Sequence, residues 1–372
     1  MTAREDTQAC DPCLRRSRLI AHLSPRITGL LGRRGGSASG LLALPDHELI
    51  AAAGGRGKEA AREQLARFDA TAERSRLAEA GAFAVCRHSA AYPSQLGELP
   101  DPPAALFCVG RPEALLAIGT APAVAIVGTR RPSPYGTEVA YSLGRGLGAA
   151  GVAVVSGLAL GIDATAHRGC LDGSGAAVAV LACGPDRAYP RRHRRLHEQV
   201  AERGVVLSEL PPGTQAQRWS FPARNRIMAG LARLTLVVEA ADPSGSLITA
   251  DFARDLGRVV AAVPGRVTAR MAAGTNGLLR DGAVPVTSTE DVLDELYGVG
   301  VRPDRAGAGR RPVPVDAGLR EVLDAVEAGA GVDEIVRRTR SSAAEVRVAL
   351  GRLEAEGHVV RGVLGGWERA AM

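Results

Sequence analysis

The segment FPARNRIMAG, from Phe221 to Gly230, places an arginine on either side of an asparagine, and a helix needs none of these three residues for its stability. A guanidinium carries several N–H donors in one plane and can bind a phosphate through two parallel hydrogen bonds. An asparagine amide can secure a turn or contact a bound ligand. Arg224, Asn225 and Arg226 are therefore candidate phosphate-binding residues, and Phe221 is a candidate for stacking on a base.

The turn formed by Gly128, Thr129 and Arg130 is a second candidate for phosphate binding. It follows the apolar run VAIVG and precedes a helix that we expect to begin near Ser133. A guanidinium beside the free N–H groups of a helix N-terminus makes a good anion site. The alternative is a solvated arginine in a surface loop.

The turn SGLALGIDATAH begins at Ser156 and carries residues that favour close backbone approach or proton transfer. Gly157 and Gly161 allow the backbone to approach a helix or a phosphate closely. We predict that Asp163 caps the following helix and that His167 packs or forms a hydrogen bond. A catalytic His167 is the alternative.

The segment PDRAYPRRHRRLH is strongly basic and follows another apolar run. Its helix start carries Arg191, Arg192, Arg194 and Arg195. Charge runs are usually solvated faces, but together with the arginines above they could form a groove too extended for one phosphate, which favours a polymer backbone. Tyr189 and Phe221 each precede an arginine cluster and could stack on a base, although for Tyr189 we expect a core position.

The first apolar run is not followed by a motif for a nucleotide cofactor. No GxGxxG follows the first apolar run, as a dinucleotide site would require, and no GxxxxGK[ST] is present for ATP. Glu209 and Glu239 each end an apolar run and could act as an acid and a base, but no local signature supports this. We predict no cofactor and no catalytic residue.

The N-terminal Cys10 and Cys13 form a CxxC motif, a spacing at which two thiolates can bind one metal ion. No second CxxC and no HxxxH follows at the spacing of a zinc site. We therefore predict reduced thiols and no metal, with a zinc or redox role for this pair as the alternative.

Six short runs of small and β-branched apolar residues, each followed by a helical stretch, must position these candidates. The runs are VAIVG (124–128), VAVVSG (152–157), AVAVLACG (177–184), VVLSE (205–209), LTLVVEA (234–240) and VVAAVPG (259–265). Such a pattern predicts a parallel sheet covered on both faces, as in a Rossmann-like α/β domain. Its ligand is expected at the carboxyl ends of the strands, where the candidate residues fall.

The sequence divides into four parts. Residues 1–80 carry apolar residues at helical spacing and predict an N-terminal helical domain. The Rossmann-like domain covers 81–296 and begins with two short extended runs, AFAVC and AALFCVG. A linker rich in Gly, Pro and Arg covers 297–315, and residues 316–372 predict the three helices and β-hairpin of a winged helix.

Composition sets the broad class of the protein. The 372 residues are 46% hydrophobic and 23% charged, which predicts mostly globular structure. A net charge of +6 is compatible with a polyanionic partner. The N-terminus lacks the apolar region of a signal peptide, and no stretch approaches the roughly 20 apolar residues of a membrane helix, so we expect a cytoplasmic protein without a membrane partner.

Seven segments occur in an order that resembles the DNA-processing protein A family, DprA or Smf. They are VAIVGTRRPSPYG, VVSGLALGIDATAH, YP, SELPPG, FPARNRIMAGL, VVEAADPSGSLITADFA and AVPG. The resemblance covers residues from about 85 to 292, and many members also carry an N-terminal helical domain and a C-terminal winged helix.

The resemblance implies a protein that binds single-stranded DNA in natural transformation. Such proteins protect incoming strands, load the recombinase RecA onto them, act as homodimers and hydrolyse no nucleotide. The family's phosphate-binding turn falls on Gly128, Thr129 and Arg130, and its basic segment falls on Arg224 and Asn225. The family often has an arginine where this chain has Leu160.

The complete predicted site combines phosphate contacts with one stacking position. The phosphate contacts are Gly128, Thr129, Arg130, Ser156, Gly157, Arg191, Arg192, Arg224, Asn225 and Arg226, and the stacking residue is Phe221. Two other functions stay open. A nucleotide-processing enzyme on a related Rossmann-like fold would suit carboxylates near strand ends, although the PGGxGTxxE signature is missing, and a transcriptional regulator would act through the winged helix.

Overall fold

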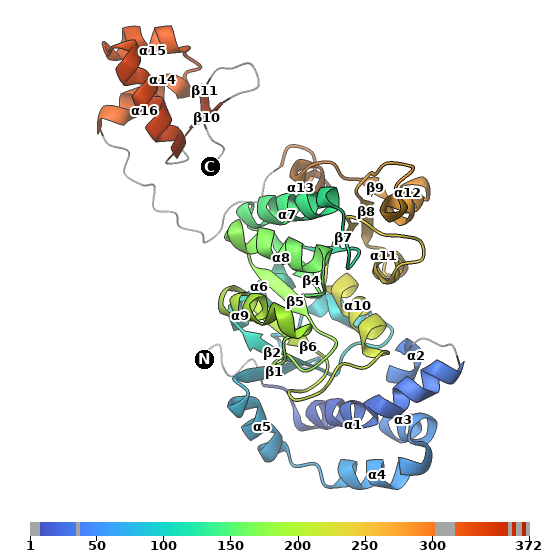
Figure 1. Ribbon diagram of the computed structural model, residues 1–372. Helices are drawn as coiled ribbons and strands as arrows, with labels where there is room; N and C mark the ends of the chain where they lie inside the picture. The colour runs from blue at the N-terminus through green and yellow to red at the C-terminus, as the bar shows by residue number, and fades with distance from the viewer. Residues whose placement is uncertain (1–7, 35–37, 302–316, 356–358, 362–366, 370–372) are drawn as a thin grey trace. The chain divides into compact units, whose positions relative to one another are not determined.

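The computed structural model of this protein describes residues 8–34, 38–301, 317–355, 359–361 and 367–369. The chain divides into two compact units, residues 1–305 and 306–372. In the first unit, helices pack against a central sheet, and further helices lie near the N-terminus (Figure 1). None of the helices in the described ranges combines the length and the apolar character that crossing a membrane requires.

Nine strands of the described chain form one sheet in the order β1-β2-β6-β5-β4-β3-β7-β8-β9. The strands are β1 (Ala82–Cys86), β2 (Ala105–Gly110), β3 (Ala123–Val127), β4 (Ala153–Ser156), β5 (Ala177–Val180), β6 (Val205–Ser208), β7 (Leu234–Val237), β8 (Val259–Ala262) and β9 (Val284–Pro285). Neighbouring strands from β6 across to β9 are parallel, whereas β2 is antiparallel to both β1 and β6. The six predicted runs form β3 to β8, and the two extended runs before them add an antiparallel edge, so the sheet is mixed rather than wholly parallel.

The central strands are apolar on both faces because helices cover both faces of the sheet. In β3, Val124 and Ile126 pack on one side and Ala125 and Val127 on the other, as the two-residue period of a strand requires. The first face is covered by α7 (Pro134–Ala149), α8 (Ile162–Asp172), α9 (Arg194–Arg203) and α13 (Thr289–Tyr297). The second face is covered by α6 (Pro112–Thr120), α10 (Ser220–Leu231), α11 (Gly245–Asp255) and α12 (Ala273–Arg280).

The described N-terminal residues form a small layer of five helices, and the first four of these share one apolar cluster. The five helices are α1 (Asp11–Arg34), α2 (Ser39–Leu42), α3 (Asp46–Ala53), α4 (Lys58–Ala66) and α5 (Ala70–Glu79). Leu23 and Ile27 of α1 belong to one buried cluster with Trp219, which immediately precedes α10. The Trp219 indole N–H also donates to the Ser24 carbonyl at 3.0 Å, so this helical layer is fastened to the sheet domain beside α10.

The second unit is a small three-helix domain with a β-hairpin. Its helices are α14 (Ala317–Glu327), α15 (Val332–Thr339) and α16 (Ala343–Ala355), and strands β10 (Val359–Arg361) and β11 (Trp367–Arg369) pair antiparallel. Leu323, Ile335, Leu350 and Val359 are buried together, so all three helices and the hairpin share one core. These elements are those of a winged helix.

Candidate functional site

The side of the sheet to which the chain adds its next strand reverses at β3. From β3 the chain adds β4, β5 and β6 on one side and then returns to add β7 and β8 on the other. The connection after β3 leads to α7 on one face, and the connection after β7 leads to α11 on the opposite face, which opens a crevice at the carboxyl ends of these strands. A cavity of about 370 Å³ lies there, lined by the turn after β3, the start of α8, the first half of α10 and the start of α11.

Arg224 is a buried cation that lines this cavity. Its side chain belongs to α10 and the residue is 6% exposed. Nη1 donates to the Val180 carbonyl at 2.7 Å, and Nε donates to Asn225 Oδ1 at 3.2 Å. Burial lowers the pKa of the guanidinium, and Asp163 partly offsets that effect. Among the described residues, Arg224 forms no ion pair with a carboxylate, so its charge is available to an anion in the cavity.

Gly157 makes the position of Arg224 possible. A Cβ at Gly157 would lie 1.6 Å from Arg224 Nη1, and therefore only glycine leaves room for the guanidinium. Ser156 was predicted as a phosphate contact, but its side chain is fully buried and its hydroxyl donates to the Ile126 carbonyl at 2.6 Å. Gly157 thus leaves room for the guanidinium beside the cavity, whereas the Ser156 hydroxyl forms a hydrogen bond within the sheet and is not available to a phosphate.

Asp163 lies inside the first turn of α8 rather than at its cap. The helix begins at Ile162 and its N-cap is Gly161, which has a φ of +79° that favours glycine. The Asp163 carboxylate accepts from the Gly157 N–H at 3.1 Å and also lines the cavity. Burial raises the pKa of this carboxyl, while the neighbouring Arg224 guanidinium acts in the opposite direction. The prediction of a side-chain cap is wrong, and the carboxylate instead holds the turn after β4.

Arg130 and Phe221 meet at the mouth of the crevice. The Arg130 guanidinium carbon lies 5.5 Å from the centroid of the Phe221 ring, within cation–π range. The Tyr189 ring lies 5.4 Å from that of Phe221 at an interplanar angle of 54°. Tyr189 is 46% exposed, so the expectation of a core position for it is wrong. A second cavity of about 90 Å³, which Leu160 also lines, shares Arg130, Phe221 and Arg224 with the first.

Asn225 joins α10 to the start of α11. Its Nδ2 donates to the Gly245 carbonyl at 3.2 Å, and it lines the cavity together with Ser244 and Ser246. Ser244 is the N-cap of α11, and its hydroxyl accepts from the Ser246 N–H. The N-terminus of α11 therefore faces the same cavity as Arg224 and adds the positive end of a helix dipole. The sequence contained this signal in the Ser-Gly-Ser triplet after β7.

Glu239 holds the turn that carries Gly128, Thr129 and Arg130. Its carboxylate accepts from the Ser133 N–H at 2.9 Å and from the Ser133 hydroxyl at 2.6 Å. Its backbone carbonyl accepts from the Thr129 N–H at 2.7 Å. Ser133 is the N-cap of α7, as expected. Glu239 therefore fixes the shape of the turn and orients the start of the helix.

Arg226 lies apart from the cavity, on another side of α10. It is 1% exposed, and its Nε and Nη2 form ion pairs with Asp101 at 2.9 Å and Glu209 at 2.8 Å. The structure therefore removes Arg226 from the predicted phosphate contacts, because its guanidinium is already occupied by two carboxylates. The Glu209 carboxylate takes part in this buried ion pair, and therefore it does not face the cavity as an acid or base would.

The remaining candidates lie outside the two cavities. Arg191 and Arg192 belong to a 3₁₀ turn, Arg191–His193, and are exposed beside Tyr189 and Pro190. Neither side chain lines the two cavities, so their contact with phosphate stays a prediction. His167 is fully buried, and its Nε2 lies 3.2 Å from the Val178 carbonyl, in agreement with the expected interior hydrogen bond.

Comparison with known proteins identifies the family. The family model described as DNA recombination-mediator protein A matches residues 83–297, and the model described as DprA winged helix domain matches 306–362. This chain belongs to the DprA family. Protein Smf of Synechocystis sp. is 43% identical over 205 residues, which are 55% of this chain, and the chain spans 52% of that relative's length.

Two solved structures of the family resemble the fold. The X-ray structure of DNA processing protein A from Streptococcus pneumoniae has a TM-score of 0.61 and 32% sequence identity, and the match covers 78% of this chain and 99% of the other. The structure of DNA processing protein A from Helicobacter pylori, which concerns its single-stranded DNA binding mode, has a TM-score of 0.52 and 31% identity, and covers 58% and 95% of the two chains. The DprA fold, with its C-terminal winged helix, therefore applies to this chain.

Proposed function

We propose that this DprA family member binds single-stranded DNA, with little sequence preference, in the crevice at the carboxyl end of β3. The observation that carries the proposal is Arg224, a buried cation that lines the cavity and has no carboxylate ion-pair partner among the described residues. Asp163 compensates this charge only in part and without an ion pair, and a DNA phosphate would supply a direct partner. Arg130, Gly128 and Thr129 border the same space from the other side.

The aromatic pair at the crevice mouth favours single strands over duplex. A base can stack on Phe221 or Tyr189 only when it is not already stacked inside a double helix. A cavity of about 370 Å³ also suits one or two nucleotides rather than a duplex. The Helicobacter pylori relative, whose structure concerns single-stranded DNA binding, supports the same ligand for this chain.

Family membership extends the proposal to a cellular role. We infer that the chain protects incoming strands in natural transformation, passes them to RecA, and works as a homodimer in the cytoplasm without enzymatic activity. The structural use of Glu209 and Glu239 supports a binding protein, because the carboxylates suggested as acid and base fasten Arg226 and Ser133 instead. Incubation with nucleoside monophosphates and with DNA tests this point, and release of free base or cleaved DNA would contradict it.

The winged helix is proposed as a protein-contact domain rather than the main DNA surface. Residues 316–369 contain eight arginines and ten acidic residues, and this balance repels phosphate at long range. A chain that ends at residue 305 should therefore keep most of its affinity for single strands. A large loss of affinity in that chain, with its oligomeric state unchanged in light scattering, would contradict the proposal.

The decisive experiment is a titration of labelled oligothymidine and of a duplex of equal length over a range of salt concentrations. Arg130→Ala and Arg224→Ala should each lower the single-strand salt slope by roughly 0.7, which corresponds to one lost phosphate contact. Arg254→Ala is the control, because Arg254 lies in the last turn of α11, at the end opposite the cavity, and pairs with Asp251. Duplex binding as tight as single-strand binding would overturn the proposal.

A further inference from the structure

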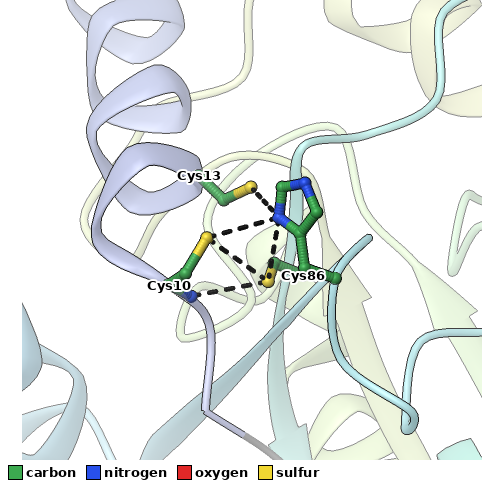
Figure 2. Close-up of side chains that lie close together, drawn as sticks. Cys10, Cys13 and Cys86 are labelled. Carbon is green, nitrogen blue, oxygen red and sulfur yellow. Dashed lines mark hydrogen bonds between the residues drawn. The ribbon is translucent and has the colours of Figure 1, made fainter.

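Three of the six cysteines converge on one histidine, away from the crevice. Cys10 immediately precedes α1 and Cys13 lies in its first turn, while Cys86 ends β1 and His88 follows two residues later. One ligand atom from each side chain lies within 4.8 Å of all the others. Figure 2 shows the Cys10, Cys13 and Cys86 sulfurs directed toward one imidazole nitrogen. We call these four residues the Cys3His cluster.

The distances in the Cys3His cluster match the edges of a zinc tetrahedron. His88 Nδ1 lies 3.4 Å from the sulfurs of Cys10 and Cys13 and 3.9 Å from that of Cys86, and the Cys10 and Cys86 sulfurs are 3.8 Å apart. Zn–S bonds of about 2.3 Å and Zn–N bonds of about 2.0–2.1 Å, at tetrahedral angles, give S···S edges of about 3.8 Å and S···N edges of about 3.6 Å. Four of the six edges therefore lie close to these values, and the other two, which join the Cys13 sulfur to those of Cys10 and Cys86, are no longer than 4.8 Å.

We propose that this protein binds one structural Zn²⁺ ion through four ligands, Cys10, Cys13, Cys86 and His88. Four protein ligands complete the tetrahedral coordination of zinc and leave no open position for a substrate or for water, so the ion is structural rather than catalytic. An iron–sulfur cluster does not suit the site, because its several iron and sulfide atoms would push the four ligands farther apart.

A disulfide explains less of this arrangement than a metal does. A disulfide joins two sulfurs at about 2.05 Å and would leave the third sulfur and the imidazole without a role. All three cysteines are free thiols in the structure, and the Cys10–Cys86 sulfur distance is well beyond bonding. Two distant chain segments bring three thiols and one imidazole together. Thiolate and imidazole are the donor groups that zinc prefers.

The surroundings of the Cys3His cluster suit a thiolate–metal centre. The backbone N–H of Cys10 points to Cys86 Sγ at 3.4 Å, an orientation that stabilises a thiolate ligand. Three thiolates, a neutral imidazole and Zn²⁺ leave one net negative charge. Arg15 and Arg87 line the same cavity as Cys13 and His88 and supply compensating positive charge.

The proposed ion would fasten the first helix to the edge of the sheet. β1 is the outermost strand, and beyond it Gln8 forms an isolated bridge with Ala84 while the Ala9 N–H donates to the Ala84 carbonyl at 2.8 Å. Two ligands come from the start of α1 and two from the end of β1, so the metal ion would join the helix to the strand. An edge strand closed in this way is protected from pairing with another chain.

The test is the metal content of the full-length chain, purified without a histidine tag. We expect about one zinc per chain by elemental mass spectrometry, and a Co²⁺-substituted protein with the intense visible bands of a tetrahedral thiolate site. Cys86→Ser should lose most of the zinc. Cys170→Ala is the matched control, because Cys170 is a buried free thiol outside the cluster, and it should keep the zinc.

The Co²⁺ spectrum keeps the test decisive if Cys86→Ser fails to fold. His88→Gln removes an exposed ligand and should shift the Co²⁺ bands while the thiolate-to-metal charge-transfer band persists. The proposal is overturned if reduced wild-type protein from zinc-supplemented medium holds no more zinc than Cys86→Ser and takes up no Co²⁺. An intact mass lower by two hydrogens, which reveals a disulfide in the purified chain, would equally overturn it. These measurements involve no DNA, so their outcome is independent of the proposed function.

Discussion

The Arg130 guanidinium carbon lies 5.5 Å from the centroid of the Phe221 ring, so a cation and an aromatic face meet at the mouth of one crevice. The two residues come from separate elements, the turn after β3 and the first turn of α10. A nucleotide carries a phosphate and a base side by side. Arg130 could therefore bind the phosphate while Phe221 stacks on the base of the same nucleotide. Substitutions of the two residues should then affect DNA binding in different ways.

Phe221→Ala should weaken single-strand binding by about 1–3 kcal/mol, the usual contribution of one base–aromatic stack. The salt slope should stay unchanged, since no phosphate contact is lost. Phe221→Tyr is the control that keeps an aromatic face. Fluorescence anisotropy with labelled oligothymidine at several salt concentrations measures both quantities. Equal affinity for the alanine and tyrosine variants would show that the ring is not a stacking platform.

Gly157→Ala should impair binding through Arg224, without removing a charge. The added methyl would lie 1.6 Å from Arg224 Nη1, so the guanidinium must leave its bond to the Val180 carbonyl. We expect affinity to fall toward that of Arg224→Ala. Gly97→Ala is the control, because a Cβ at Gly97 meets no atom within 4 Å. Wild-type affinity in Gly157→Ala would show that the position of Arg224 does not matter for the DNA.

The contrast between Arg224 and Arg226 shows what the sequence could and could not predict. Successive residues of a helix differ by about 100° around its axis. Arg224 and Arg226 are two positions apart in α10, so their side chains point in different directions and cannot line the same groove. Once that segment is recognised as a helix, the sequence itself separates the two arginines. The partners of Arg226 were not predictable, because Asp101 and Glu209 reach it only through long-range folding.

Arg226→Met should destabilise the first unit by about 3–5 kcal/mol, because it leaves Asp101 and Glu209 buried without their cation. The folded protein should still bind oligothymidine with the wild-type salt slope. Urea unfolding measures the first effect and anisotropy the second. Adding Asp101→Asn and Glu209→Gln to Arg226→Met should restore part of the stability, since no unpaired charge then remains. A reduced salt slope in Arg226→Met would return this residue to the phosphate site.

For the sheet and the cysteines too, local sequence patterns were predictable and long-range contacts were not. Strands β3 to β8 were predictable because each is a local apolar run covered on both faces. The antiparallel direction of β1 and β2 depends on pairing with β6, which follows them far along the chain, and no local pattern records it. The CxxC of Cys10 and Cys13 was visible, but Cys86 and His88 join it only when β1 packs beside α1.

His167 gives the stability of the first unit a specific dependence on pH. Its Nε2 faces the Val178 carbonyl and so carries the hydrogen of the neutral ring, while Nδ1 is buried with no hydrogen-bond partner in the part of the chain that the structure describes. A second proton would place an unsatisfied charge in the core. The pKa of His167 is lowered to about 4, mainly because the ring is buried. Arg224, His193 and Arg168 act in the same direction, and the hydrogen bond to the Val178 carbonyl acts in the opposite one.

Stability should therefore fall as the pH drops below the unfolded histidine pKa of about 6.5. In this range the unfolded chain binds a proton that the folded chain does not, so unfolding becomes easier as the pH falls toward 4. Between pH 8 and pH 5 the His167 contribution corresponds to about 2 kcal/mol of lost stability. His167→Gln cannot titrate, so its free energy of unfolding in urea should fall by about 2 kcal/mol less than that of wild type over this interval. Identical pH profiles for the two proteins would show that His167 titrates normally in the folded state.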